Sequence, residues 1–414
     1  MIAEILATGD EIRSGSLVDS NSAYISQRIE EIGVEVSRHI SVGDDLDILA
    51  STFKEISNRA QIAVVTGGLG PTSDDLSAQA AAIAMGVELA LDEEALKSME
   101  AFFIKRNLPM GVSNKKQAYL PVGSRIIHNP VGTAPGFYVK INRCLFFFLP
   151  GVPFEMKTML KNTVLLKINE ILGDNRQICI VKTISTFGIT ESAAGERLLE
   201  LTDLFPDIKL GFRSKFPVIQ IKIYVYGKDQ EKLNLRIKEV EAYVLEKFGK
   251  KVFSVNDTSM EAVVGELLRS KGLTLAIAES CTGGLISHLI TNQPGSSDYF
   301  LFSGVTYSNK SKINLLGVSE KTLEKYGAVH EETAKEMAQG AKRIAGASHG
   351  IATTGIAGPG GGTEDKPVGT ICIGMATPDE VKGFTYKFPF PKRSMNKMIF
   401  AMKAIDLLRL ELQN

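Results

Sequence analysis

The chain has 414 residues, of which 44% are hydrophobic and 23% charged, values typical of a globular protein with about three domains. Its 47 basic and 47 acidic side chains balance, which argues against direct nucleic-acid partners and anionic membrane surfaces. The longest apolar runs, such as CLFFFL at residues 144–149, are far shorter than the ~20 residues of a membrane helix.

Two further features bear on where the protein works. The N-terminus, MIAEILATGDE, has neither the basic start nor the long apolar stretch of a secretory signal. The cysteines are scattered and form neither a CxxC pair nor a small disulfide framework; they are Cys144, Cys179, Cys281 and Cys372. We therefore expect a reduced, cytoplasmic setting.

The first segment, residues 1–172, alternates predicted strands and helices. The expected strands are residues 3–8, 34–42 and 61–66, and the expected helices are residues 21–32, the stretch through Ile48 and Ile56, and the stretch from Leu76. Such alternation predicts a mostly parallel, doubly wound α/β sheet. In sheets of this kind ligands bind beyond the carboxyl ends of the strands.

A glycine-rich loop, GGLGPTSDD, follows the third of these strands. Its Gly67, Gly68 and Gly70 allow a backbone to approach a phosphate closely, and Asp74 and Asp75 can hold a divalent ion that bridges phosphate oxygens. The alternative is a tight strand–helix turn in which an aspartate caps the helix. From the residues of this loop alone, both interpretations stay open.

Longer strings in the same segment resemble a known family. TGGLGPTSDD, together with GTAPGF at residues 132–137 and LPGVPFEM at residues 149–156, resembles the molybdopterin-binding fold as it occurs in the competence/damage-inducible CinA family. The resemblance covers the whole segment, including GDE at residues 9–11 and DSN at residues 19–21.

The resemblance implies a site for a nucleotide-type pyrophosphate. Some members of the family are credited with metal-dependent cleavage of ADP-ribose to AMP and ribose 5-phosphate, and a divalent cation suits that chemistry because it neutralises the pyrophosphate and lowers the pKa of a bound water. By motif position, the implied metal ligands are Asp44, Asp74 and Asp75. The implied nucleotide site consists of Gly67, Gly68, Gly70, Thr72 and Asp10.

Gly173, Asp174 and Asn175 mark a boundary in the sequence. The middle segment, residues 174–252, has the pattern of a small α+β module. Strands are expected at residues 178–186 and 219–225 and helices at residues 190–201 and 233–248. In the CinA family this segment resembles a KH-like insert, a fold often associated with RNA. It has no GxxG clamp between helices and no aromatic platform, so we expect a spacer or dimerisation element and a homodimer.

The last segment, residues 257–414, again predicts an α/β domain. The expected strands are residues 273–278, 300–308, 350–354, 370–376 and 383–388, and the expected helices start at Ser259 and cover residues 285–290, 331–345 and 394–412. Two strands run into glycine-rich turns, ESCTGG and GIAGPGGG. A strand that ends in such a turn and opens a helix presents backbone N–H groups to an anionic ligand.

Ser280, in the first of these turns, is the candidate nucleophile. There are two alternatives. Ser280 can be a helix N-cap, or the nucleophile can be Cys281, with a thiol pKa lowered by the helix N-terminus. None of the five histidines is an obvious base, so the candidate base is a lysine just past residues 300–308, with Lys310 and Lys312 as rivals. Burial can lower a lysine pKa by about three to five units, and Ser-Lys catalysis is an established variant of the catalytic triad.

Five strings in this segment, AESCTGG, VTYSNKSK, GAVHEETA, GIAGPGGG and KPVGT, closely resemble the nicotinamide-nucleotide amidohydrolase domain of the CinA family. The implied reaction deamidates nicotinamide mononucleotide to nicotinate mononucleotide and ammonia, without a metal or other cofactor. By motif position Ser280 is the nucleophile and Lys312 the base, with Tyr307 in the same site. The implied substrate-binding residues are Glu279, Thr282, Gly283, Gly284, Asn309, Gly355, Ala357, Gly358, Arg393 and Lys397.

One position of this last segment departs from the family pattern, as Arg13 does in the first segment, where relatives usually carry an apolar residue. Family members tend to carry two spaced arginines before the last helix, and Lys397 stands where the second is expected. A lysine is a point charge and lacks the bidentate fork of arginine, so we expect weaker phosphate binding with the chemistry unchanged.

Taken together, these features predict a three-part enzyme: a doubly wound molybdopterin-binding-like domain, a KH-like α+β module and an α/β amidohydrolase domain at residues 257–414. Its expected partners are nicotinamide mononucleotide and ADP-ribose. Two other classes remain open, a non-catalytic nucleotide- or pterin-binding protein and a non-catalytic partner of the DNA uptake machinery.

Overall fold

The computed structural model describes residues 1–173 and 177–413. The chain divides into two compact units, Met1–Val181 with Val225–Leu235, and Lys182–Tyr224 with Arg236–Asn414. The predicted boundary residues Asp174 and Asn175 lie outside the described residues. Within the described ranges, no helix is both long enough and apolar enough to cross a membrane.

The first unit contains a six-stranded sheet of order β2-β1-β3-β8-β7-β6. Its parallel strands are β1 (Ile2–Thr8), β2 (Glu35–Val42), β3 (Ile62–Thr66) and β8 (Cys144–Leu149), and its antiparallel edge is formed by β7 (Gly136–Ile141) and β6 (Arg125–Ile127). The predicted doubly wound α/β architecture is confirmed, with an antiparallel edge added to it.

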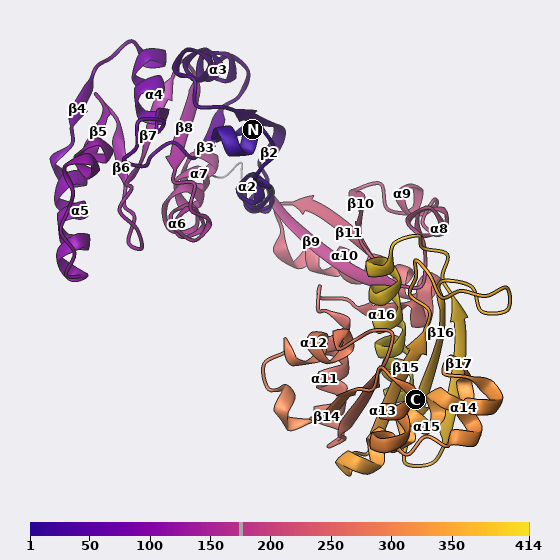
Figure 1. The fold of residues 1–414 in the computed structure, drawn as a ribbon. Helices are drawn as coiled ribbons and strands as arrows, with labels where there is room; N and C mark the ends of the chain where they lie inside the picture. Colours follow the sequence, from indigo (N-terminus) through magenta and orange to yellow (C-terminus); the bar gives the residue numbers. More distant parts are fainter. Residues whose placement is uncertain (174–176, 414) are drawn as a thin grey trace. The chain divides into compact units, whose positions relative to one another are not determined.

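Helices cover both faces of this sheet (Figure 1). One face carries α3 (Leu46–Arg59), α4 (Ser77–Met85) and α5 (Glu93–Lys105), and the other α2 (Ser20–Glu30), α6 (Pro153–Met159) and α7 (Leu165–Leu172). Side chains alternate along a strand, so Phe146 and Phe148 pack against Phe53 on one face while Phe147 packs on the other. The smaller elements are α1 (Asp10–Arg13), β4 (Leu89–Leu91), β5 (Tyr119–Pro121), η1 (Val112–Ala118) and η2 (Leu160–Val164).

The middle segment forms a four-stranded sheet of order β10-β11-β9-β12. Its elements are β9 (Ile178–Phe187), α8 (Glu191–Arg197), α9 (Leu201–Leu204), β10 (Ile208–Lys215), β11 (Val218–Gly227), α10 (Gln230–Phe248), η4 (Gly249–Lys251) and β12 (Val252–Ser254). The predicted helix over residues 190–201 is too long. It ends at Arg197, because Leu198 leaves the helical conformation; Gly195 inside this last turn also weakens the helix.

The C-terminal domain is built on a five-stranded sheet of order β14-β13-β15-β16-β17. Its parallel strands are β13 (Leu275–Glu279), β14 (Phe300–Val305) and β15 (His349–Gly355), and its antiparallel strands are β16 (Thr370–Ala376) and β17 (Val381–Lys387). One face carries α11 (Met260–Ser270), α12 (Leu285–Thr291) and α16 (Arg393–Leu412), and the other α13 (Asn309–Leu316), α14 (Glu320–Tyr326) and α15 (Glu331–Ala345).

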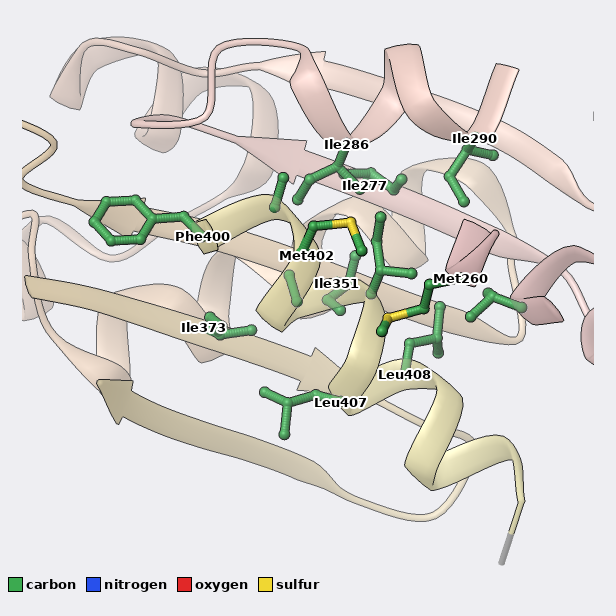
Figure 2. Packing of buried hydrophobic residues seen from close by; sticks show 14 of the residues in the cluster. Met260, Ile277, Ile286, Ile290, Ile351, Ile373, Phe400, Met402, Leu407 and Leu408 are labelled. Carbon is green, nitrogen blue, oxygen red and sulfur yellow. The ribbon is translucent and has the colours of Figure 1, made fainter. Parts of the chain in front are cut away.

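The helix α16 forms the centre of the main core of this domain. Figure 2 shows its Phe400, Met402 and Leu408 among side chains from the sheet and from the neighbouring helices, such as Ile351 and Met260. Since these side chains are almost fully buried, each stabilises the fold by roughly 1.5–3 kcal/mol relative to leaving it exposed. The core therefore fixes the body of α16 against the sheet.

One predicted element of this domain is wrong in a way that matters for the site. The strand expected over residues 300–308 ends at Val305, and α13 begins at Asn309 after a short turn. Ser308 caps this helix by accepting a hydrogen bond from the Ser311 N–H at 3.1 Å. Lys312 therefore lies on a helix, which the sequence pattern did not indicate.

Candidate active site

The ESCTGG turn is held from behind by a buried carboxylate. Glu279 has no exposed surface, and its oxygens accept hydrogen bonds from Ile286 N at 3.1 Å, Ser287 N at 2.9 Å and Ser287 Oγ at 2.6 Å. Gly283 and Gly284 take positive φ angles of 58° and 89°, which glycine adopts without strain. Glu279 thus ties the turn to the first residues of α12, and a substrate contact would require it to leave these partners.

Ser280 of this turn and Lys312 of α13 lie next to each other. The side chain of Lys312 is 1% exposed, and its Nζ lies 3.2 Å from Ser280 Oγ, 2.9 Å from the Thr306 carbonyl and 3.2 Å from the Tyr307 carbonyl. The Ser280 N–H donates to the Thr353 carbonyl at 2.9 Å, which fixes the backbone of the serine to β15. The structure therefore brings the predicted nucleophile and the predicted base into hydrogen-bond contact.

The surroundings of Lys312 favour the neutral amine. Burial lowers its pKa because desolvation penalises the charged form, and no carboxylate pairs with it among the ion pairs of residues 1–173 and 177–413. A neutral amine has two N–H donors and one lone pair. With both donors directed to the Thr306 and Tyr307 carbonyls, the lone pair accepts the Ser280 hydroxyl proton, which is the arrangement of a general base.

The two rivals of this pair have different surroundings. Lys310 is exposed on the first turn of α13. Cys281 is 5% exposed, and burial raises the pKa of its thiol to about 12. Its sulfur packs against Gly355, where an added Cβ would come within 3.3 Å of it. Cys281 is therefore a packed thiol, and the geometry favours Ser280.

Two cations of α16 border the same turn. Arg393 donates to the Gly358 carbonyl at 2.7 Å and to the Tyr307 hydroxyl at 3.0 Å, while the ammonium of Lys397 lies beside Gly283, 3.5 Å from the position of an added Cβ. The phenol of Tyr307 is thus bonded to Arg393, and only its carbonyl meets Lys312. Arg393 links the turn before α13 to the GIAGPGGG loop.

Three other predicted substrate-binding residues, Thr282, Gly283 and Asn309, lie around the Ser280–Lys312 pair. Thr282 is buried, with its Oγ1 2.7 Å from Thr353 Oγ1, and the Gly283 N–H donates to the Ser280 carbonyl at 3.1 Å. The Gly283 amide is therefore occupied, whereas the Thr282 N–H has no hydrogen-bond partner within the described ranges. Asn309 is exposed at the start of α13.

The GIAGPGGG loop is attached to α16 by a residue that the sequence did not single out. The buried Asn396 donates through Nδ2 to the Ala357 carbonyl at 3.1 Å. An added Cβ on Gly355 would come within 2.5 Å of the Thr370 carbonyl, so only glycine fits there. In the sequence, the only indication of this role is that Asn396 lies between the two predicted binding residues Arg393 and Lys397.

The first unit has a separate cavity of about 480 Å³ at the carboxyl ends of β1, β3 and β8. Of the predicted residues it is lined by Asp44, Asp74, Asp75, Gly67, Gly68 and Gly70. Asp10 and Thr72 do not line it. The Asp10 carboxylate pairs with Arg13 at 3.1 Å, and the Thr72 N–H and hydroxyl donate to Asp75 at 2.8 and 2.5 Å.

The donor set of this cavity fits a hard divalent cation, since carboxylate oxygens are the ligands such ions prefer. The neighbouring Thr72 side chain lowers the pKa of Asp74, which favours its charged form. Glu155, from the LPGVPFEM string, also lines the cavity and accepts a hydrogen bond from Asn129 at 2.7 Å. The sequence motifs alone did not indicate this role. Within the described ranges, no three His, Cys, Asp or Glu side chains are grouped as a ready metal site.

Known proteins resemble this chain over its whole length. Family models match residues 257–412 as "CinA C-terminal domain", residues 4–170 as "Probable molybdopterin binding domain" and residues 181–254 as "Damage-inducible protein CinA KH domain". A "CinA-like protein" of Desulfosudis oleivorans is 49% identical over 412 residues, which cover 100% of both chains. The chain belongs to the CinA family. The resemblance stated from the sequence motifs is confirmed.

Other CinA relatives carry more specific descriptions. A Shewanella oneidensis protein named "Nicotinamide-nucleotide amidohydrolase PncC" is 42% identical over 412 residues, covering 100% of this chain and 96% of that protein. A solved structure of a competence/damage inducible protein from Agrobacterium tumefaciens is 35% identical and covers 37% of this chain and 94% of its own, with a TM-score of 0.36.

The burial of Cys281 in this CinA chain gives a first prediction. Because the pKa of its thiol is about 12, iodoacetamide at pH 8 should alkylate Cys281 on the order of a thousandfold more slowly than an exposed thiol. Peptide mass spectrometry after timed labelling measures this rate. All four cysteines are buried, so urea-unfolded protein, in which each should react, is the control. Rapid labelling of Cys281 in the folded protein would restore it as a rival nucleophile.

Proposed function

We propose that the C-terminal domain is an amidohydrolase that deamidates nicotinamide mononucleotide to nicotinate mononucleotide and ammonia. The observation that supports this most directly is the buried Lys312 amine, 3.2 Å from Ser280 Oγ. The name of the Shewanella oneidensis relative supports the class of reaction and the nicotinamide-nucleotide substrate.

In the proposed reaction, Ser280 Oγ attacks the carboxamide carbon while its proton passes to Lys312 Nζ. The C–N bond then breaks, Lys312 returns that proton to the leaving nitrogen, and ammonia departs from a Ser280 ester. Water attacks the ester, again giving its proton to Lys312, which passes it to Ser280 as the acid leaves. The Thr282 N–H, which has no other hydrogen-bond partner within residues 1–173 and 177–413, is our candidate donor to the oxyanion.

The substrate phosphate is assigned to the cations of α16. Arg393 and Lys397 lie at the N-terminal end of a 20-residue helix with no acidic residue in its first turn, so the helix dipole and both side chains favour an anion there. No metal is needed for this reaction.

Matched variants test the two catalytic assignments. Ser280→Ala and Lys312→Met, which keeps most of the buried stem, should each lower ammonia release from nicotinamide mononucleotide by at least about a thousandfold. Cys281→Ala and Lys310→Met should stay within about threefold of the wild type, since neither side chain is placed to react. If Lys310→Met lost activity and Lys312→Met kept it, the base would be Lys310. If only Cys281→Ala lost activity, the nucleophile would be Cys281.

The pH dependence tests the state of the base. Lys312 must be neutral to accept a proton, so kcat/KM should rise with pH and then level off. Since burial lowers the pKa of Lys312 from its ordinary value of 10.5, the midpoint of this rise should lie below pH 10.5. Ammonia release across pH 5 to 11 measures it, and the residual activity of Lys312→Met should lack the rise. A midpoint at or above the ordinary lysine value contradicts the assignment.

We propose a second activity for the first unit, metal-dependent hydrolysis of the pyrophosphate of ADP-ribose to AMP and ribose 5-phosphate. The cavity of about 480 Å³, with its glycine loop and three aspartates, supports this proposal. Asp44, Asp74 and Asp75 line the cavity but are not grouped as a ready three-carboxylate site within the described ranges, so they would hold the divalent cation only together with the substrate. When bound, the cation supplies charge neutralisation and an acidified water. The glycines at 67, 68 and 70 give the phosphates close access to backbone N–H groups.

This second activity predicts a metal-dependent release of AMP. With Mg²⁺ or Mn²⁺ the wild type should form AMP from ADP-ribose, and excess EDTA should abolish it. Asp75→Asn should lower the rate by at least about a hundredfold. Asp45→Asn is the control, because Asp45 caps α3 through the Ile48 N–H at 2.9 Å and asparagine caps equally well. Chromatography of the products decides. No AMP from the wild type, or equal AMP from Asp75→Asn, would overturn the proposal.

A further inference from the structure

A hairpin of the middle module reaches the segment that leads into α16. Phe216 lies at the tip of this hairpin, between β10 and β11, and its ring meets that of Phe390 edge-on, with centroids 5.0 Å apart and planes at 84°. Phe390 in turn packs against the core cluster that contains α11, α12 and α16. Both rings belong to the same compact unit. The contact lies three residues ahead of Arg393.

The segment that carries Phe390 is short and stiff. Residues 389–392 read Pro-Phe-Pro-Lys, and each proline fixes its own φ. The Phe390 carbonyl accepts a hydrogen bond from Asn396 Nδ2 at 2.9 Å, and the same nitrogen donates to the Ala357 carbonyl at 3.1 Å. Because Phe390, the first turns of α16 and the GIAGPGGG loop are bonded to one another, a movement of Phe390 is transmitted to Arg393.

The middle module holds α16 at its other end as well. Arg409 is 1% exposed and donates to the Lys250 carbonyl at 2.8 Å while it pairs with Asp406 at 2.7 Å. Between the two ends a cavity of about 230 Å³, lined among others by Phe216, Met398 and Met402, separates the module from this helix. Phe187, Phe253 and Val218 of the module also pack against the core cluster that contains α16. The Phe216–Phe390 pair is the ring contact that the module makes with the segment leading into this helix.

We propose that Phe216 is a positioning residue for Arg393, through which the middle module sets the affinity of the Ser280 site for the phosphate of its substrate. This inference rests on the proposed amidohydrolase function. Phe216 itself touches neither Ser280 nor Lys312 in the contacts described above. Its removal frees Phe390 and loosens the bonds of Arg393 to Gly358 and Tyr307, so it affects binding of the phosphate and spares the chemical step.

The test is a comparison of two substrates. Phe216→Ala should raise KM for nicotinamide mononucleotide about three- to tenfold, the range expected for loss of an aromatic pair, with kcat changed less than about twofold. For nicotinamide riboside, which lacks the phosphate, kcat/KM should not change. Phe205→Ala is the matched control, because Phe205 stacks edge-on with Tyr243 inside the same module at 6.1 Å and makes no ring contact with Phe390. It should leave both substrates unaffected.

A double-mutant cycle separates positioning from general loss of stability. In an Arg393→Ala background, adding Phe216→Ala should raise KM no further, whereas additive effects would overturn the inference. Equal effects of Phe216→Ala on both substrates, or an unchanged KM, would also overturn it while the amidohydrolase function stands. If the wild type releases no ammonia and Ser280→Ala binds no nicotinamide mononucleotide by calorimetry, the proposed function fails and this inference fails with it.

Discussion

The burial of the Lys312 amine is the constraint on which the geometry of the C-terminal site depends. An amine removed from water is costly unless its donors are satisfied, and here two backbone carbonyls satisfy them. Those carbonyls are available only because β14 stops at Val305 and the chain turns before α13 begins. The third contact of the amine is Ser280 Oγ, so the turn that satisfies the lysine also aims it at the serine.

The rest of the site is fixed mainly by hydrogen bonds to backbone groups. Glu279 holds the ESCTGG turn through the first N–H groups of α12, and Arg393 and Asn396 hold the GIAGPGGG loop through its carbonyls. A carboxylate that is buried and directed at a helix N-terminus compensates its own desolvation. Glu279 forms no ion pair with Lys312 among those of residues 1–173 and 177–413. Anchoring of this kind positions the loops without an ion pair to the Lys312 amine, whose pKa is lowered by burial.

The two sites of this CinA chain follow the same architectural rule with opposite electrostatics. Each places a glycine-rich loop at the carboxyl ends of parallel strands, where open α/β sheets bind ligands. The cavity of the first unit is lined by Asp44, Asp74 and Asp75, a set that suits a cation brought with a pyrophosphate. The C-terminal site is bordered by Arg393 and Lys397, which suit an anion directly. This difference supports different proposed substrates for the two domains.

The sequence by itself determined the architecture, because strand and helix periodicity and helix caps are local signals; α15, β16 and nearly all of α16 were predicted with their observed bounds. It also located the ESCTGG turn and limited the base to two lysines. Only the tertiary structure separated these lysines. Two positions apart on a helix, they differ by about 200° around its axis, so Lys312 faces the interior and Lys310 the solvent. The same holds for the buried thiol of Cys281, for Asn396 and Glu155, and for Asp10 and Thr72, which do not line the cavity. Burial and long-range contact depend on which elements meet in space, and local patterns of residues do not contain that information.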